Sequence, residues 1–445
     1  MGRGVDRVPG ADCAVARRFW PAVWDLEADG YGASMSEGGF AAATVAFRHR
    51  DFRIFWFAAL VSNTGSWMQN AAIPFVIFRL TGSNADVGAT GFWQYAPVMV
   101  MGIVGGSLAD RFHRRTLLIV TQVTQAIFAV ALYIEVASGT ATVTHITVLA
   151  FCSGLAGGLN IPVWQSFVSQ LVPREALSNA VILNSTQFNA ARALGPLIGF
   201  TLATIWDPAI VFLVNAVSFA SVLLALPFIS VGRERPARLA NRPSALADLA
   251  DGARYVWRSP GIRACCLAIL AIAGLGSPLF SFLPAGFGQE IFGLGKVGIG
   301  VLAGAGGIGA LIAAPLLLTR FATVARSKLL VGAMLIYGSA TIVVGVAPAV
   351  GVAVIGVVAF GGSYLAIASA INTTIQMSSR ENMRGKSIAI YIACLTGALP
   401  IGSFVWGRAA EAFGLRWTAV GAGVALIVVT AALRASGRLD AMSAD

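Results

Sequence analysis

The sequence predicts an all-α integral membrane protein with twelve transmembrane helices in two pseudo-symmetric six-helix bundles. Composition, the spacing of apolar windows and an internal repeat support this prediction. Of the 445 residues, 57% are hydrophobic and only 11% are charged. So few polar residues cannot cover a soluble globule of this size, so most of the surface is expected to face lipid.

Apolar windows of about 20 residues are long enough to cross the hydrocarbon core as helices. In the first half they lie near 54–78, 87–108, 116–137, 144–170, 178–205 and 208–230. In the second half they lie near 263–286, 297–318, 328–347, 350–376, 386–407 and 416–434. The predicted units are an N-terminal segment at 1–52, bundles at 53–230 and 263–436, a linker at 231–262 and a tail at 437–445.

The two halves repeat each other at a nearly constant offset. At an offset of 210 residues Pro74 matches Pro284, and Val87-Gly88 match Val297-Gly298; at 206, Gln170 matches Gln376. An internal duplication explains matches that keep one register, and it places two bundles on either side of a central path.

The gaps between windows set the expected topology. Most of the 31 lysines and arginines fall in the termini, the linker and alternate gaps. On the opposite side lie only Arg79, Lys296, Arg408 and Arg416. Because cytoplasmic loops carry the excess of basic residues, both termini are expected in the cytoplasm and the chain in the inner (cytoplasmic) membrane.

The linker contains a candidate amphipathic helix. Ser244 can cap it, and Leu246, Leu249, Ala253, Val256 and Trp257 follow at steps of three and four residues. We expect this helix to lie along the cytoplasmic membrane face.

A patch of charge separates the second and third windows. Residues 106–115 read Gly-Ser-Leu-Ala-Asp-Arg-Phe-His-Arg-Arg, and such a patch belongs at the aqueous end of a span. The pattern resembles the loop signature of the major facilitator superfamily of transporters, with His113 where that family usually has glycine. The resemblance implies a charged latch, for which the candidate residues are Asp110, Arg111, Arg114, Arg115 and, at the start of the eleventh span, Lys386, whereas Gly106 is a structural residue of the motif.

Further segments narrow the resemblance. Asp51-Phe52-Arg53, residues 61–69 and Leu80-Thr81-Gly82-Ser83 are similar to the superfamily branch that includes enterobactin and macrolide exporters. Gly195-Pro196-Leu197-Ile198-Gly199 resembles the core of the fifth-helix motif of drug/proton antiporters. The resemblance implies the major facilitator fold and export, with close helix packing and a bend at Gly195, Pro196 and Gly199.

Two polar stripes are candidates for the lining of the central path. Asn63, Trp67, Asn70 and Pro74 recur at helical spacing on the first span, where helix packing is the alternative interpretation. On the fifth span Asn189 and Arg192 share a stripe with Pro196 and Gly199. A charge at membrane depth is costly, so Arg192 should face the bundle interior, either in the cavity or paired with backbone carbonyls. Gln376 is a further cavity candidate.

Several function classes are excluded. The sequence has no Gly-x-x-x-x-Gly-Lys-Ser/Thr loop for ATP and no cluster of histidines or carboxylates for a metal or an enzyme site. The basic residues lie in gaps rather than on one soluble face, which argues against nucleic acid. Four of the five cysteines lie in apolar runs, so no disulfide framework is expected.

These patterns predict a monomeric secondary exporter of a small amphiphilic molecule such as a drug, siderophore or secondary metabolite. The expected partners are that small molecule, the proton gradient and the lipid bilayer, and no cofactor is expected. An importer of a small solute and a membrane sensor that does not transport remain alternatives.

Overall fold

The computed structural model describes residues 45–230, 245–282, 284–321 and 323–437. The predicted tail, most of the N-terminal segment and the first part of the linker lie outside these ranges. Within them the chain forms helices joined by short connections, and no β-strand occurs.

The first half forms a short 3₁₀ turn, η1 (Val45–Arg48), and six long helices, and each of the six overlaps one predicted window. They are α4 (Arg50–Thr81), α5 (Asn84–Arg111), α6 (Arg114–Ala137), α7 (Val143–Val168), α8 (Leu177–Ile205) and α9 (Ala209–Ala225). Short 3₁₀ turns, η2 (Arg174–Ala176) and η3 (Leu226–Phe228), precede α8 and follow α9. Left-handed Gly82, with φ of 66°, ends α4, because this backbone conformation suits glycine.

The second half begins with a helix that is broken by two π turns. Its segments are α11 (Pro260–Ala271), η4 (Ile272–Gly276), α12 (Ser277–Phe282), α13 (Pro284–Gly286) and η5 (Phe287–Ile291). The helices that follow are α14 (Lys296–Thr319), α15 (Arg326–Val346), α16 (Val350–Ser378), α17 (Glu381–Phe413) and α18 (Leu415–Ala435). The glycines and prolines between residues 260 and 291 account for the breaks, because they weaken or remove intrahelical hydrogen bonds.

Nine helical runs among the described residues are long and apolar enough to cross a membrane. The helices α4, α5 and α8 are not among these nine, although each overlaps a predicted window. The predicted all-α membrane fold is therefore confirmed, whereas the count of twelve spans stays a prediction.

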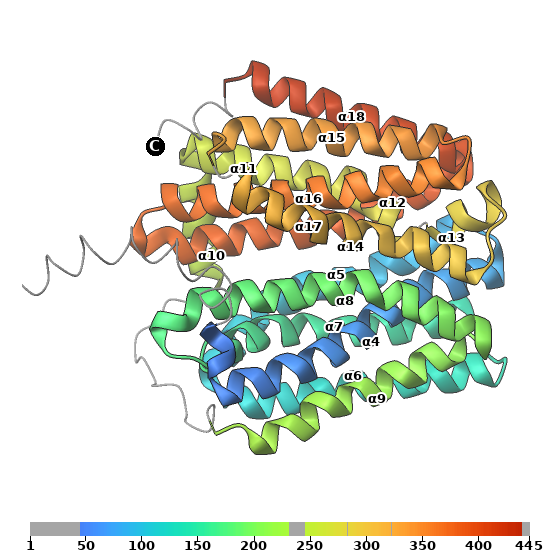
Figure 1. Cartoon of the computed structure of the whole chain (residues 1–445), viewed down its shortest axis with the longest axis horizontal. Coiled ribbons are helices and arrows are strands. Elements are labelled where there is room, and N and C mark those ends of the chain that lie inside the picture. Colours follow the sequence, from blue (N-terminus) through green and yellow to red (C-terminus); the bar gives the residue numbers. More distant parts are fainter. Residues whose placement is uncertain (1–44, 231–244, 283, 322, 438–445) are drawn as a thin grey trace, which may run out of the picture.

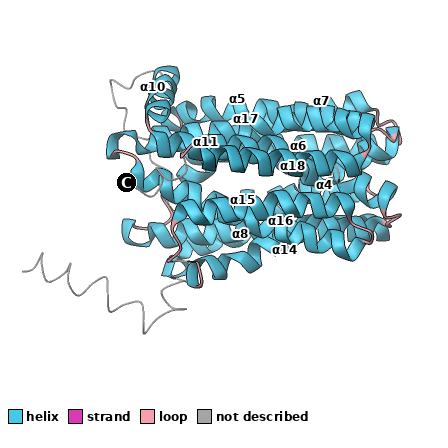
Figure 2. Cartoon of the chain, turned by 90° about the horizontal axis from the view of Figure 1, so that it is seen from above, coloured by secondary structure: helices cyan, strands magenta, loops and turns pink. Residues whose placement is uncertain are grey.

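The helices form two groups that lie side by side (Figure 1), with α4–α9 in one and α11–α18 in the other. Seen from above (Figure 2), the long helices run along a common direction. Contacts between the groups pair the second long helix of each half with the fifth of the other, α5 with α17 and α8 with α14. This exchange of equivalent helices is the pattern that a duplicated chain would produce.

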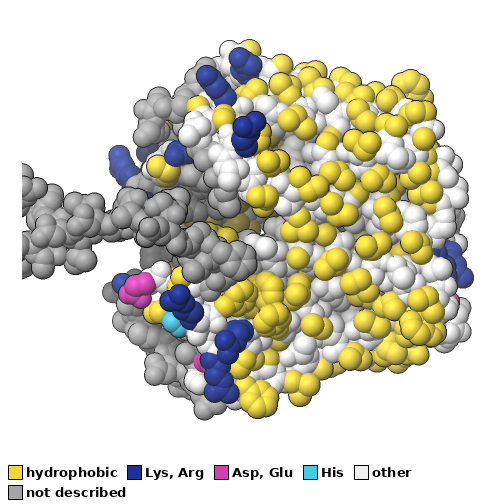
Figure 3. Space-filling view, in the orientation of Figure 1, with side chains coloured by type: hydrophobic (Ala, Val, Ile, Leu, Met, Phe, Trp, Pro, Cys, Tyr) yellow, Lys and Arg dark blue, Asp and Glu magenta, His cyan; other side chains and the backbone are white. Residues whose placement is uncertain are grey.

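The two ends of the molecule differ in charge. We call the end at which α4 begins and α10 (Ala245–Arg258) lies the linker end, and the end at which α4 stops and α18 begins the far end. Figure 3 shows hydrophobic side chains over the flank between the ends, and basic side chains gathered mainly toward the linker end. An apolar flank between charged ends suits a protein that spans a bilayer.

Buried amides join the helices of the first half. Ser62 of α4 donates to Gln122 of α6 at 3.3 Å, and Gln69 of α4 accepts from Asn215 of α9 at 2.8 Å. Thr121 of α6 donates to Asn160 of α7 at 2.8 Å. Because lipid offers no hydrogen bonds, polar side chains at this depth are paired with each other.

The contact between α8 and α14 depends on glycines. Gly300, Gly304 and Gly307 of α14 face α8, where a Cβ on each would meet Pro196 and Phe200, or the backbone of Ala193. On the other side of the interface, Gly88 of α5 lies against Gly407 of α17. Helices packed through glycine bring their backbones close together.

Adding one methyl group at Gly307 should therefore loosen the interface. The new Cβ of Gly307→Ala would overlap the backbone of Ala193, which cannot rotate away, so we expect a loss of about 1–3 kcal/mol. Thermal unfolding of the purified protein in detergent measures it. Gly332→Ala in α15 is the matched control, since its Cβ meets nothing within 4 Å, and it should be neutral or stabilising. Equal stability of the two variants would contradict the packing assigned to Gly307.

Candidate functional site

A cavity lies where the two halves meet. Its volume is about 60 Å³, and residues of both halves form its wall. The lining residues are Trp67, Asn70, Ala71, Pro74, Tyr95, Arg192, Pro196, Phe200, Pro284, Ala285, Ala303, Gly306, Gly307, Val357 and Phe360. This space is smaller than an ordinary drug site.

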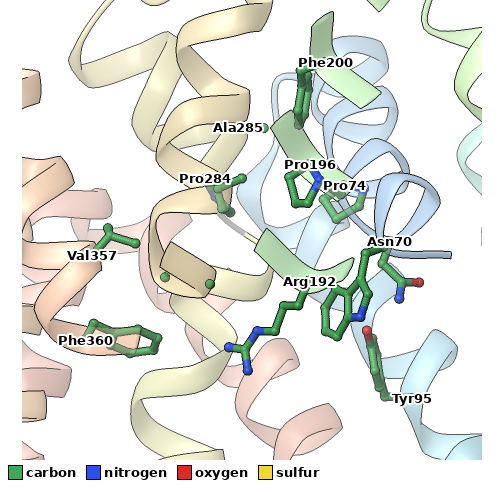
Figure 4. A pocket seen from close by; sticks show the side chains of 15 residues that line it. Asn70, Pro74, Tyr95, Arg192, Pro196, Phe200, Pro284, Ala285, Val357 and Phe360 are labelled. Atoms are coloured by element: carbon green, nitrogen blue, oxygen red, sulfur yellow. The ribbon is translucent and has the colours of Figure 1, made fainter. Parts of the chain in front are cut away.

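The cavity has a polar end and an apolar end. Figure 4 shows Asn70, Tyr95 and Arg192 toward one end, together with the ring of Phe360, and Phe200 at the other, with three prolines between them. Since α8 runs from the linker end toward the far end, Arg192 lies on the linker side of Phe200. An amphiphilic wall of this kind suits a ligand with one polar and one apolar part.

Arg192 contacts aromatic rings from both halves. Its guanidinium carbon lies 5.6 Å from the ring centroid of Trp67 on α4 and 5.1 Å from that of Tyr364 on α16. The side chain is half-buried. Among the described residues no carboxylate forms an ion pair with it. Cation–π contacts stabilise a guanidinium by about 0.5–2 kcal/mol each, which only partly offsets its desolvation.

One member of an amide pair, Asn70, lines the cavity together with Arg192. Asn70 accepts a hydrogen bond of 3.0 Å from the side-chain amide of Gln94 on α5. The Gln94 carbonyl oxygen is buried and has no hydrogen-bond partner among the described atoms. The sequence analysis identified Asn70 but not Gln94, because Gln94 does not belong to a series of polar residues at helical spacing.

The prolines connect the cavity to the internal repeat. Pro74 and Pro284, which match at the repeat offset, both line the cavity. Pro196 lies between them in α8, as Figure 4 shows. Gly195 and Gly199 pack α8 closely on α4, where their Cβ atoms would meet Trp67 and Met68.

Three predicted cavity residues lie elsewhere in this conformation. Asn63 donates to Gln187 at 3.1 Å inside the first half. Asn189 donates to the Ser185 carbonyl of its own helix at 2.9 Å, and exposed Gln376 donates to Asn372 at 3.1 Å. None of the three is among the residues that line the cavity.

The structure places the predicted latch residues at the linker end. Gly106, Asp110 and Arg111 lie in the last turns of α5, and their side chains are outside the described part. Arg114 and Arg115 begin α6. Arg115 donates to the carbonyl oxygens of Leu226 at 2.6 Å and Ile229 at 3.1 Å. It therefore joins α6 to the end of α9 within one half, where a cation suits the C-terminal end of a helix.

Lys386 of α17 contacts the linker helix. Its ammonium nitrogen lies 3.4 Å from a carboxylate oxygen of Asp251 on α10. The predicted amphipathic helix is present as α10, with Val256 buried and Trp257 exposed. Its contact with Lys386 ties it to the second half.

A contact at the far end was missing from the sequence interpretation. Glu411 of α17 accepts hydrogen bonds from the backbone N–H of Asn84 at 2.8 Å and of Ala85 at 3.3 Å, and from the Ser83 hydroxyl at 3.3 Å. The Asn84 side chain donates to Glu290 of η5 at 3.2 Å. We call these five residues the far-end lock. It joins the start of α5 in one half to two carboxylates of the other.

The comparisons with known proteins agree with this geometry. The model of the family described as transmembrane secretion effector matches residues 41–445. The chain belongs to this family. It is thus a multi-pass membrane transporter of the major facilitator superfamily, and the predicted exporter resemblance is confirmed.

An efflux pump and an exporter are found among the curated relatives. The multidrug efflux pump Tap of Mycolicibacterium fortuitum is 24% identical over 379 residues, which cover 81% of this chain and 90% of the pump. The enterobactin exporter EntS of Shigella flexneri is 24% identical over 228 residues, which cover 50% and 55% of the two chains.

Solved structures support the fold. A bacterial homolog of the human lysosomal transporter Spinster, in an inward-facing and unoccupied conformation, superposes with a TM-score of 0.69 at 15% identity. The match covers 88% of this chain and 97% of that one. A likeness at this identity supports the architecture and not the cargo.

Proposed function

We propose that the protein is a secondary active exporter that moves a small amphiphilic molecule out across the cytoplasmic membrane by alternating access. The observation that carries this proposal is the amphiphilic cavity between the two halves, lined from both sides. A site at the interface of two repeats can face either side of the membrane as one half rocks against the other. The similarity to Tap and EntS supports export and a drug or siderophore as cargo.

The cavity must widen for transport. At about 60 Å³ it is too small for a drug-sized molecule. The far-end lock and the glycine contacts hold the far end together, so release on that side requires their separation. With both termini in the cytoplasm, as the basic residues at the linker end favour, the far end faces outward.

The latch residues take a revised part in this cycle. Arg115 stays within its own half, while Asp110, Arg111, Arg114 and Lys386 occupy the linker end where the halves would separate in an inward-open state. The proton gradient is the proposed drive, and Glu290 and Glu411 add two acids to the candidates for proton binding.

Cells that overproduce the protein should accumulate less of a fluorescent amphiphile, and a protonophore should restore the accumulation. The Arg192→Leu variant should reach the membrane in equal amount but should not lower the accumulation, because the described wall of the cavity loses its charged side chain. Dye fluorescence in whole cells and a membrane immunoblot measure the two effects.

Inside-out vesicles separate the parts of the proposal. Inward pumping that ignores an imposed pH gradient would refute proton coupling alone. Uptake of the amphiphile into whole cells would refute export in favour of an importer, and binding without flux would favour a sensor.

A further inference from the structure

The first inference concerns the charge of the cargo, and it rests on the proposed export function. Arg192 presents a positive charge to the cavity. Among the described residues the rings of Trp67 and Tyr364 stack on its guanidinium, and no carboxylate pairs with it. The other ionisable side chain that lines the cavity, Tyr95, is neutral at ordinary pH. We propose that the cavity binds organic anions, with the carboxylate or phenolate of a planar amphiphile on Arg192.

Several features fit this ligand class. A guanidinium donates in a fork that matches a carboxylate, and cation–π contacts through its faces leave its edge free for such bonds. The side chain of Asn70 lies in the same wall and adds amide donor capacity. In the widened cavity that binding requires, Phe200 and the prolines at the opposite end would contact an apolar ring system. A cationic amphiphile would meet Arg192 without a counter-charge, which is unfavourable at membrane depth.

Binding of two matched probes to the purified protein tests this. The anion 2-naphthoate should bind about tenfold or more tightly than the neutral 2-naphthamide, since bonds to a charged group are the stronger ones. Arg192→Gln should remove the preference, and Arg192→Lys should keep part of it. The control is Arg408→Gln, which should keep the preference. The guanidinium carbon of Arg408 also lies over a ring, 4.7 Å from the centroid of Phe404, but outside the cavity.

Two outcomes would overturn the inference. One is equal affinity of the parent protein for both probes. Stabilisation of the parent against heat by chloride alone, without a preference between the probes, counts as the same outcome. The other is a preference that survives in Arg192→Gln. Binding in detergent does not require transport, so failure here is distinct from failure of the export proposal.

The second inference concerns the far-end lock and stands on separate contacts. Glu411 caps the N-terminus of α5 from the opposite half, where the helix dipole favours a negative charge. Glu290 accepts a hydrogen bond from the side chain of the same Asn84. Both carboxylates belong to exposed residues. We propose that protonation of Glu411 from the outer solution releases α5 and opens the far end.

The surrounding charges leave Glu411 dependent on α5. The charged residues at this end on η5, α5, α17 and α18 are Glu290, Asp86, Arg408 and Arg416, and the neighbouring α4 and α14 add Arg79 and Lys296. Lys296 donates to the Ala203 carbonyl. Arg416 donates instead to the carbonyls of Gly345 and Ala347. Within the described ranges no basic side chain forms an ion pair with Glu411. Neutralising it therefore removes the attraction to the α5 N-terminus, so acid weakens the lock and neutral pH favours it.

Labelling of a cavity cysteine reports the opening. In a variant without the five natural cysteines, Ala71→Cys lines the cavity, and a membrane-impermeant maleimide is added on the far side. The labelling rate of the Ala71→Cys variant is divided by that of an Ala137→Cys variant, whose altered position is exposed at the far end. This ratio corrects for the pH dependence of the reagent. The relative rate should rise about two- to fivefold from about pH 7.5 to about pH 4, because glutamate side chains take up a proton only near pH 4.

Glu411→Gln should label fast at both pH values, and Asp86→Asn, a matched change in the first turn of α5, should behave as the parent. A parent without pH dependence would refute the proposal even if Glu411→Gln failed to fold. A Glu411→Gln variant whose labelling rate keeps the pH dependence of the parent would also refute the proposal.

Discussion

The absence of side chains at a few points of the interface is the constraint on which the rest of the structure depends. Gly300, Gly304 and Gly307 allow α14 to lie against α8, and Gly88 and Gly407 do the same for α5 and α17. Only at this separation can residues of both halves line one small cavity. Arg192 of α8 can then reach Tyr364 of α16, and Pro74 can share a wall with Pro284. The cavity is a consequence of the glycine contacts.

Polar groups inside the molecule differ in whether another protein group pairs with them. Amides such as Gln69 and Asn215 are paired within the first half, as expected where lipid supplies no partners. Arg192 has aromatic rings in place of an acid, and the buried carbonyl oxygen of Gln94 has no partner among the described atoms. Buried polar atoms without a partner also occur elsewhere among the described residues, for example at Gln170 and Gln187, so it is the position of Arg192 and Gln94 that sets them apart. Polar groups left unsatisfied by the protein are the ones that a ligand can satisfy.

Residues of the cavity wall could be expected from the sequence where a single helix carries the signal. The stripe of Trp67, Asn70 and Pro74 and the charge of Arg192 were found because helical spacing and membrane cost act locally. The sequence alone could not place Asn63 or Gln376, because which of several polar side chains reaches the centre depends on helix rotation. The contact of Glu411 with Asn84 was out of reach for the same reason, since it joins residues 327 positions apart. Only the packing of the halves brings them together.

The interface contacts also differ in what their separation costs. Glycine contacts are made by backbone and methyl groups, so parting them loses dispersion energy and no hydrogen bonds. The polar contacts at the far end are different in kind: Glu411 on the α5 N-terminus, and Lys296, which donates to the Ala203 carbonyl at 2.6 Å. Both lie where water can replace the lost bonds. A rocking motion of the halves therefore meets a weak, non-directional resistance along its length and a directional one at the far end, and a small change of charge there is enough to shift the balance between conformations.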